Sequence, residues 1–228
     1  MPLSKPPMDD NILYPDLKNY FERSTEEVDS ISKERQHILE KISSYLYEKM
    51  TKIEPTKLIF ICTHNSCRSQ IAQLWVQIAT HYYGITDLQA FSGGTEVSAF
   101  NPKAINTLAR AGLKIKSCST GTNPIYHVTY GFRISPIEMF SKTYQDPSNP
   151  QNNFCTILTC ESADRNCPII TNSDDRFVLY YKDPKEFDNT PREKLIYDTT
   201  CRQISREICY IFSNLVSKFT PKGDNGCN

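Results

Sequence analysis

The sequence has no long apolar segment and no excess of charge of either sign. Lysine and arginine number 26, aspartate and glutamate also 26, and no long basic run appears. This balance argues against nucleic acid or a membrane surface as the main partner. The first residues, MPLSKPPMDD, contain no apolar core of signal-peptide length, and no later segment approaches the roughly 20 apolar residues of a membrane span. We therefore expect a soluble, cytoplasmic protein that acts on a small molecule or on another protein.

Cysteine is too sparse for a disulfide scaffold. Nine cysteines in 228 residues lie below the roughly 8–10% typical of such scaffolds, and an odd number cannot all pair within one chain. In a reducing compartment most of them stay free thiols, so their positions carry more information than their number.

The polarity of the chain changes near position 55. Before it, apolar residues recur at helical spacing, which predicts a helical extension over residues 1–55. After it, alternating strands and helices predict an α/β domain with a mainly parallel sheet over residues 56–220. Residues of about 118–153, rich in Thr, Pro, Asn and Tyr, predict an insertion, and residues 221–228 a flexible tail. The predicted strands are 57–62, 88–91, 154–159 and 176–180, and the predicted helices 68–83, 102–111 and 195–219.

The segment CTHNSCRS, residues 62–69, lies between a predicted strand and a predicted helix. Such a loop points backbone N–H groups and the positive end of the helix dipole at one spot, which binds oxyanions. Because thiols at helix amino termini titrate at about 3.5–7.5, we expect Cys62 to be largely thiolate at neutral pH and to act as a nucleophile. Arg68 can donate hydrogen bonds to two oxygens of the anion, and the Ser69 hydroxyl can donate one to the thiolate. The expected oxyanion-binding residues are Thr63, His64, Asn65, Ser66, Cys67, Arg68 and Ser69.

The stretch CTHNSCRSQIAQLW resembles the phosphate-loop signature shared by low-molecular-weight protein tyrosine phosphatases and thioredoxin-coupled arsenate reductases. FSGGTE, NPKAINTLARAG and ILTCESADRNCPII resemble the reductase branch, and the similarity ends with KDP around Asp183. It covers roughly residues 57–215 apart from the insertion. The resemblance implies the low-molecular-weight tyrosine phosphatase-like fold, a four-stranded parallel sheet flanked by helices, here with an N-terminal helical extension.

The resemblance to the reductases also implies a relay of thiols. Cys62 would attack arsenate held by Arg68, and Asp183 would protonate the departing oxygen. Cys160 and then Cys167 would carry the oxidation outward as disulfides, and thioredoxin would reduce the last of these near the surface. An extended ESADRN segment would hold these two cysteines about 23–25 Å apart, so it must loop or unwind to join them, and we expect a polar loop there.

The resemblance implies neither a bound cofactor nor a metal ion. Gln73 stands where some of the reductases have a carboxylate that helps to hold potassium, so this ion is not expected. A zinc site is disfavoured because the cysteine pairs have four and six intervening residues, outside the usual spacing of structural zinc ligands.

Two other functions stay open. The first is a phosphatase that hydrolyses phosphotyrosine or small phosphate esters through a phosphocysteine at Cys62, although Lys185 stands where such enzymes commonly have an aromatic residue. The second is a non-catalytic module whose extension binds a partner, which an intact nucleophile loop disfavours. The apolar stripe of the extension either packs onto the domain or pairs two chains, and amphipathic helices do the former more often. Deletion of residues 1–50 is expected to weaken stability or change assembly while the thiol chemistry survives.

The remaining distinctive residues are expected to play lesser parts. His64 either narrows access to the loop or is an exposed side chain, and Cys67 is expected to be a small packing residue. Burial is expected to account for four other cysteines, which are Cys118, Cys155, Cys201 and Cys209.

Overall fold

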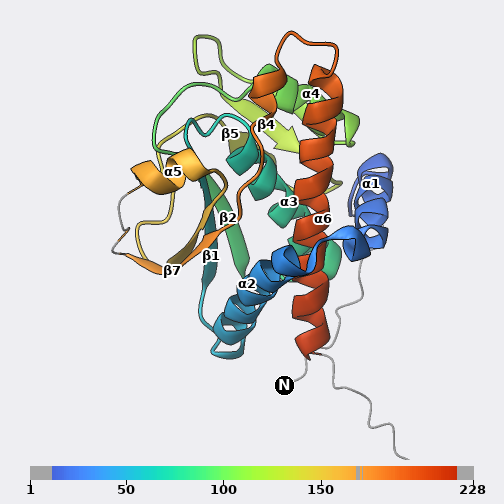
Figure 1. Ribbon diagram of the computed structural model, residues 1–228, viewed down its shortest axis with the longest axis vertical. Coiled ribbons are helices and arrows are strands. Elements are labelled where there is room, and N and C mark those ends of the chain that lie inside the picture. Colours follow the sequence, from blue (N-terminus) through green and yellow to red (C-terminus); the bar gives the residue numbers. More distant parts are fainter. Residues whose placement is uncertain (1–11, 168–169, 171, 220–228) are drawn as a thin grey trace, which may run out of the picture.

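Four parallel strands form the central sheet of the structure, a computed structural model that describes residues 12–167, 170 and 172–219 (Figure 1). The strands lie in the order β2-β1-β6-β7, and each neighbouring pair is parallel. Their bounds are β1 (Thr56–Cys62), β2 (Leu88–Gly94), β6 (Phe154–Leu158) and β7 (Ser173–Val178). The predicted sheet is confirmed, whereas the predicted flexible tail lies outside the described residues.

The central strand β1 is buried on both faces, as expected for a parallel sheet covered by helices. Successive side chains of a strand point to opposite faces, and here they enter two separate hydrophobic clusters. Leu58 and Phe60 belong to the larger cluster, while Ile59 and Ile61 belong to a second one. Figure 1 shows helices α6 and α5 on the corresponding opposite sides of the sheet.

The helices cover the sheet and each other. Their bounds are α1 (Pro15–Glu26), α2 (Lys33–Thr51), α3 (Arg68–Tyr83), α4 (Pro102–Arg110), α5 (Glu161–Asn166) and α6 (Glu193–Phe219), with short 3₁₀ helices η1 (Val28–Ser30) and η2 (Pro184–Phe187). Helix α3 has the predicted bounds, because Gly84 ends it with the left-handed φ of 68° that glycine adopts without steric cost. Within the described ranges, no helix is both long and apolar enough to cross a membrane.

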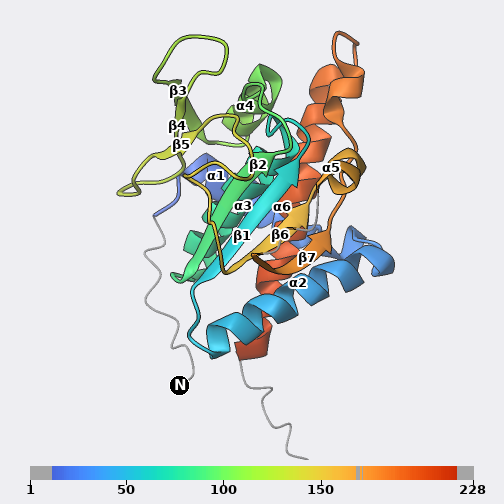
Figure 2. The ribbon, with the colours of Figure 1, turned by 90° about the vertical axis from the view of Figure 1, so that its left-hand side faces the viewer.

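The segment predicted as an insertion contains most of a second sheet. Its three antiparallel strands are β3 (Lys114–Ser117), β4 (Tyr126–Thr129) and β5 (Ile137–Met139). The first of these strands precedes the predicted insertion. Figure 2 shows this sheet beside the carboxyl end of β2, on the side of the molecule away from α2. The N-terminal segment also joins it, because Tyr14 N–H donates to the Tyr130 carbonyl over 3.1 Å.

The helical extension contributes directly to the main hydrophobic core. Leu17 and Phe21 of α1 and Leu39, Ile42 and Leu46 of α2 have no exposed surface, and all of them belong to the larger cluster. Both helices pack against α6, and Figure 1 shows α1 beside it and α2 crossing it. The apolar stripe of the extension therefore packs onto the domain.

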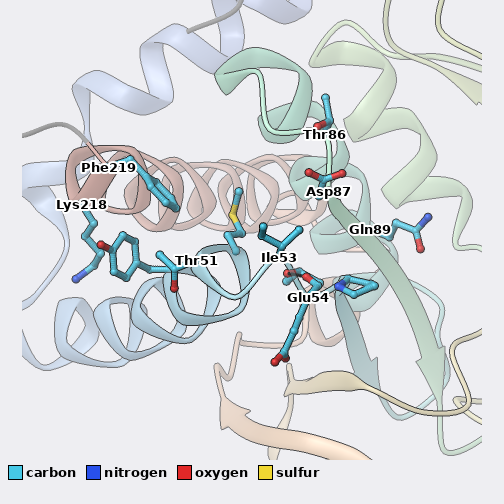
Figure 3. A pocket seen from close by; sticks show the side chains of 12 residues that line it. Thr51, Ile53, Glu54, Thr86, Asp87, Gln89, Lys218 and Phe219 are labelled. Carbon is cyan, nitrogen blue, oxygen red and sulfur yellow. Dashed lines mark hydrogen bonds between the residues drawn. The ribbon is translucent and has the colours of Figure 1, made fainter. Parts of the chain in front are cut away.

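Ile53 follows helix α2 in a backbone conformation that suits glycine. Its φ of 56° is left-handed, which costs a non-glycine residue about 1–2 kcal/mol. Its side chain is 91% exposed and gains little from burial. Figure 3 shows it at the turn before β1, among side chains that line a pocket of about 750 Å³. We expect Ile53→Gly to stabilise the protein by up to about 1 kcal/mol, seen as a higher urea midpoint with an unchanged slope.

The matched control for this prediction is Ile53→Ala. Alanine retains the Cβ atom that makes a left-handed residue unfavourable, so its urea midpoint should stay close to that of the wild type. A glycine variant that unfolds at lower urea than the alanine variant would contradict the assignment of strain to this residue.

Candidate active site

The loop of residues 62–69 joins the carboxyl end of β1 to the amino end of α3. Every carbonyl from residue 62 to 66 is held from outside the loop, by Thr95 N, Glu96 N, Ser141 Oγ, Gln70 Nε2 and Asn101 N in that order. Because the C=O and N–H of a peptide point in opposite directions, the N–H groups face the centre of the loop. Asn65 supports this curvature with a left-handed φ of 45°. The loop therefore has the form of an anion cradle at a helix amino terminus.

The Cys62 thiol lies at the base of this cradle and is 3% exposed. Its sulfur lies 3.1 Å from Ser69 Oγ, which in turn accepts a hydrogen bond of 2.9 Å from the Asn65 amide. A thiolate has no proton to donate, so in that state the Ser69 hydroxyl donates to the sulfur. This contact ties the Cys62 sulfur to the first turn of α3.

Arg68 and Asp183 are in direct contact. The Arg68 guanidinium donates to Asp183 Oδ2 over 2.6 Å and to the Tyr181 carbonyl over 3.0 Å. The other Asp183 oxygen accepts from Lys185 N–H at the start of η2. The Arg68 side chain is 10% exposed and that of Asp183 33%, so the acid faces solvent at the rim while the arginine lies deeper. The structure thus brings together three of the predicted catalytic residues, Cys62, Arg68 and Asp183.

Cys160 and Cys167 lie at the two ends of helix α5 and are both buried. The predicted polar loop between them is wrong, because ESADRN is helical. Ala163 has no exposed surface and packs into the second cluster, and two acidic residues in the first turn complement the helix dipole. Seven residues of helix rise about 10.5 Å, more than the roughly 4.4–6.8 Å between the Cα atoms of a disulfide. Helix α5 must therefore unwind before these two cysteines can join.

Contacts with β7 and the residues after it hold α5 in place. Asp164 accepts hydrogen bonds from Arg176 and from the Tyr180 hydroxyl. The bonds from Tyr180 and Arg176 lower the pKa of Asp164, so this carboxylate is charged at neutral pH. Any unwinding of α5 has to break or carry along these contacts.

Three cysteines share the second hydrophobic cluster, namely Cys62, Cys160 and Cys167. The Cys160 sulfur lies 3.4 Å from Thr63 Oγ1, the residue next to Cys62, so it borders the anion loop. Burial raises the pKa of the Cys167 thiol, which limits its thiolate fraction while α5 is folded. The three thiols therefore belong to one cluster beside the anion loop, with Cys160 and Cys167 at opposite ends of α5.

Most other described cysteines are buried and weakly acidic. Burial raises the pKa of Cys67, Cys155 and Cys209, and that of Cys201 to about 12. These thiols stay protonated at neutral pH and fit the packing role expected of them. The expectation for Cys118 is wrong: it is exposed, because it follows β3 at the edge of the small sheet.

His64 and Gln73 differ in their surroundings. The His64 side chain is 46% exposed, and its Nε2 atom lies 3.2 Å from Glu96 Oε2, so it projects from the rim of the loop. Gln73 is 5% exposed, within α3.

Among the described residues, no group of three or more His, Cys, Asp or Glu side chains is placed to hold a metal ion.

The small sheet region supplies supports that the sequence did not reveal. Ser141 Oγ donates to the His64 carbonyl over 2.7 Å, and Lys142 N–H donates to Asn65 Oδ1 over 3.0 Å. The Tyr181 carbonyl that holds Arg68 was missed as well. A backbone group that accepts or donates a hydrogen bond cannot be recognised from the type of its side chain. The one available signal was that Tyr181 lies two residues before Asp183, which was a predicted site residue.

Gly94 permits the close approach of β2 to the anion loop. A Cβ atom here would meet three backbone atoms, Glu96 O at 2.6 Å, Asn65 N at 2.7 Å and Thr63 O at 2.7 Å. We expect Gly94→Ala to displace the loop and to weaken inorganic phosphate binding by about tenfold to a hundredfold, measured by calorimetry. Gly93→Ala is the control, because its Cβ atom would meet Tyr144 instead of the loop. Equal phosphate affinity in wild type and Gly94→Ala would contradict the prediction.

Comparison with known proteins agrees with this geometry. Residues 57–127 match the family model described as low molecular weight phosphotyrosine protein phosphatase. Arsenate reductase 2 of Staphylococcus haemolyticus is 30% identical over 113 residues, which is 50% of this chain and 66% of the relative. An arsenate reductase of Staphylococcus aureus is 29% identical over 128 residues, 56% of this chain and 77% of the relative.

One of the similar solved structures is a low molecular weight phosphotyrosine phosphatase from Vibrio cholerae. Its sequence identity is 14%, its TM-score is 0.47, and the match covers 73% of this chain and 98% of that one. Residues 57–127, which include the anion loop, therefore resemble the low molecular weight phosphotyrosine protein phosphatase family, and the chain is similar to arsenate reductases over about half of its length.

Proposed function

We propose that this enzyme is a thioredoxin-coupled arsenate reductase. The observation that carries the proposal is the presence of Cys62, Cys160 and Cys167 in one hydrophobic cluster beside the anion loop. Hydrolysis of a phosphocysteine needs only the first of these thiols, whereas reduction of arsenate needs two electrons, which a pair of thiols supplies when it forms a disulfide.

In the first step, arsenate binds to the inward-facing N–H groups of the loop. The Cys62 thiolate attacks arsenic and forms an S–As bond, while a hydroxyl group of arsenate takes a proton from Asp183 and leaves as water. Arg68 stabilises the charge on the remaining oxygens. The arsenic is still pentavalent at this stage.

In the second step, the Cys160 thiolate attacks the Cys62 sulfur. A Cys62–Cys160 disulfide forms, the S–As bond breaks, and its electron pair stays on arsenic, which leaves as trivalent arsenite. Cys167 then attacks the Cys160 sulfur as α5 unwinds, so Cys62 departs as a thiolate and a Cys160–Cys167 disulfide remains. Reduced thioredoxin restores both thiols and becomes oxidised itself.

The alternative is a phosphatase that acts on phosphotyrosine or small phosphate esters. The match of residues 57–127 to a phosphatase family favours it, and the same loop, Arg68 and Asp183 would serve it. In that case water cleaves a phosphocysteine at Cys62 and Asp183 protonates the leaving group.

Coupled turnover separates the two functions. We expect arsenate-dependent oxidation of NADPH by the wild-type protein in the presence of thioredoxin and thioredoxin reductase, and none when thioredoxin is omitted. Hydrolysis of para-nitrophenyl phosphate is the parallel assay. Brisk hydrolysis without any arsenate turnover would overturn the reductase proposal in favour of the phosphatase.

A further inference from the structure

The contact that holds Arg68 is itself supported by the N-terminal extension. Arg68 donates to the carbonyl of Tyr181, whose side chain is buried. The ring of Tyr181 is covered by the guanidinium of Arg35, with Cζ 4.9 Å from the ring centroid. Arg35 belongs to helix α2, so a residue outside the matched family segment lies one layer behind the anion loop.

Arg35 is fixed in this position by a buried carboxylate. Its Nε and Nη2 atoms donate to the two oxygens of Glu207 over 3.0 Å and 2.8 Å, and Glu207 is only 2% exposed. Gln203 of α6 donates to the same carboxylate over 3.0 Å. A two-bond contact between a planar guanidinium and a carboxylate sets orientation as well as distance. Glu207 of α6 therefore fixes the orientation of the Arg35 guanidinium over the Tyr181 ring.

We propose that Arg35 is a positioning residue for Arg68, an inference that rests on the proposed role of Arg68 in binding the oxyanion. Tyr181 N–H donates to the Thr159 carbonyl over 3.0 Å, which anchors the backbone, and Arg35 covers the ring. Together they fix the direction of the Tyr181 carbonyl. That carbonyl and Asp183 both bind the Arg68 guanidinium. A shift of Tyr181 would therefore move the Arg68 guanidinium and the Asp183 carboxyl group together.

A second ion pair of the same residue types offers a control, and its carboxylate is more exposed, at 42% for Glu27 against 2% for Glu207. Arg202 of α6 donates to the two oxygens of Glu27 over 2.9 Å and 2.8 Å, and its Cζ lies 4.7 Å from the ring centroid of Tyr20. This pair also joins the extension to α6 through an arginine over a tyrosine. Tyr20 does not belong to the segment that holds Arg68, so loss of this pair removes similar stabilising contacts without touching the site.

The test compares Arg35→Met/Glu207→Met with Arg202→Met/Glu27→Met. Replacing both partners avoids leaving one buried charge unpaired. For each protein, calorimetry gives the Kd of inorganic phosphate, para-nitrophenyl phosphate gives kcat and KM, and thermal unfolding gives Tm. We expect the first variant to lose about tenfold to a hundredfold in kcat/KM and in phosphate affinity, since small displacements at a reacting centre have effects of this size. The second variant should lower Tm while its kcat/KM and Kd stay close to those of the wild type.

If the double variant does not fold, Arg35→Lys provides a second test of the role of Arg35. Lysine retains a cation near Tyr181 but lacks the planar two-bond contact to Glu207, so an intermediate loss of phosphate affinity is expected. Phosphate affinity and kcat/KM unchanged by every Arg35 substitution that folds, or lowered equally by the Arg202 control, would overturn the inference. A wild-type protein that binds neither phosphate nor arsenate would instead refute the proposed function.

Discussion

Cys167→Ser is expected to reduce one arsenate per chain and then stop. Without the Cys167 sulfur, the Cys62–Cys160 disulfide cannot be transferred, so the nucleophile stays blocked and thioredoxin-coupled turnover falls to background. A single-turnover assay should detect one equivalent of arsenite. Peptide mapping under non-reducing conditions should find residues 62 and 160 linked.

Cys160→Ser is expected to fail one step earlier. Arsenate can still bind and be attacked by Cys62, but no neighbouring thiol completes the two-electron reduction, so no arsenite is released. Hydrolysis of para-nitrophenyl phosphate, if the wild type shows it, should survive in both variants because water cleaves that intermediate. The contrast between the two assays separates loss of the relay from loss of the anion site.

Cys118→Ser serves as the control for these two variants. Its thiol is exposed at the edge of the small sheet, so its removal should leave both assays unchanged. Multiple turnover with thioredoxin in both Cys160→Ser and Cys167→Ser would rule out the relay.

Deletion of residues 1–50 is expected to prevent stable folding. The deleted segment contains fully buried side chains that include Leu17, Phe21, Leu39, Ile42 and Leu46. Each such side chain contributes about 1.5–3 kcal/mol on burial, so the loss is on the order of 10 kcal/mol, comparable with the total stability of many domains. The effect is larger than the weakening expected from the sequence. Circular dichroism during thermal unfolding should show no cooperative transition.

Two phenylalanine variants test the same idea within a full-length chain. Phe21 is fully buried and stacks against Trp75, so Phe21→Ala should cost about 3–5 kcal/mol. Phe132 is 52% exposed, and Phe132→Ala should cost far less. A cooperatively folded deletion protein, or equal urea midpoints for the two alanine variants, would show that the extension is not part of the core.

Sequence patterns predicted the elements that have strong local signals. Helix α3 has the predicted bounds because its buried stripe and its terminal glycine agree. Helix α4 begins as predicted, where the Asn101 side chain accepts from Lys103 N–H. Strands β1 and β6 were found because they are short apolar runs, whereas β7 begins at Ser173 and not at the predicted residue 176 because its first residues, SDD, are polar.

Elements with weak local signals were predicted poorly from the sequence. Helix α5 has only six residues, fewer than two turns, so no periodicity could distinguish it from a polar loop. The small antiparallel sheet depends on pairing between residues such as Val128 and Ile137 that are distant from the catalytic motifs. Cys118 was expected to be buried because a sequence does not show which strand lies at an edge.

The sequence by itself determined the chemistry of the anion loop, because Cys62, Arg68 and Ser69 lie within one strand, loop and helix. Local spacing is sufficient there, since backbone geometry over eight residues fixes which groups converge. Only the tertiary structure decided the contact between Arg68 and Asp183, the placement of Arg35 behind Tyr181, and the common cluster of three thiols. These partners are separated by many residues and meet only because the parallel sheet ends at one edge and α6 packs against the extension. Such contacts depend on how whole elements pack, which no local pattern encodes.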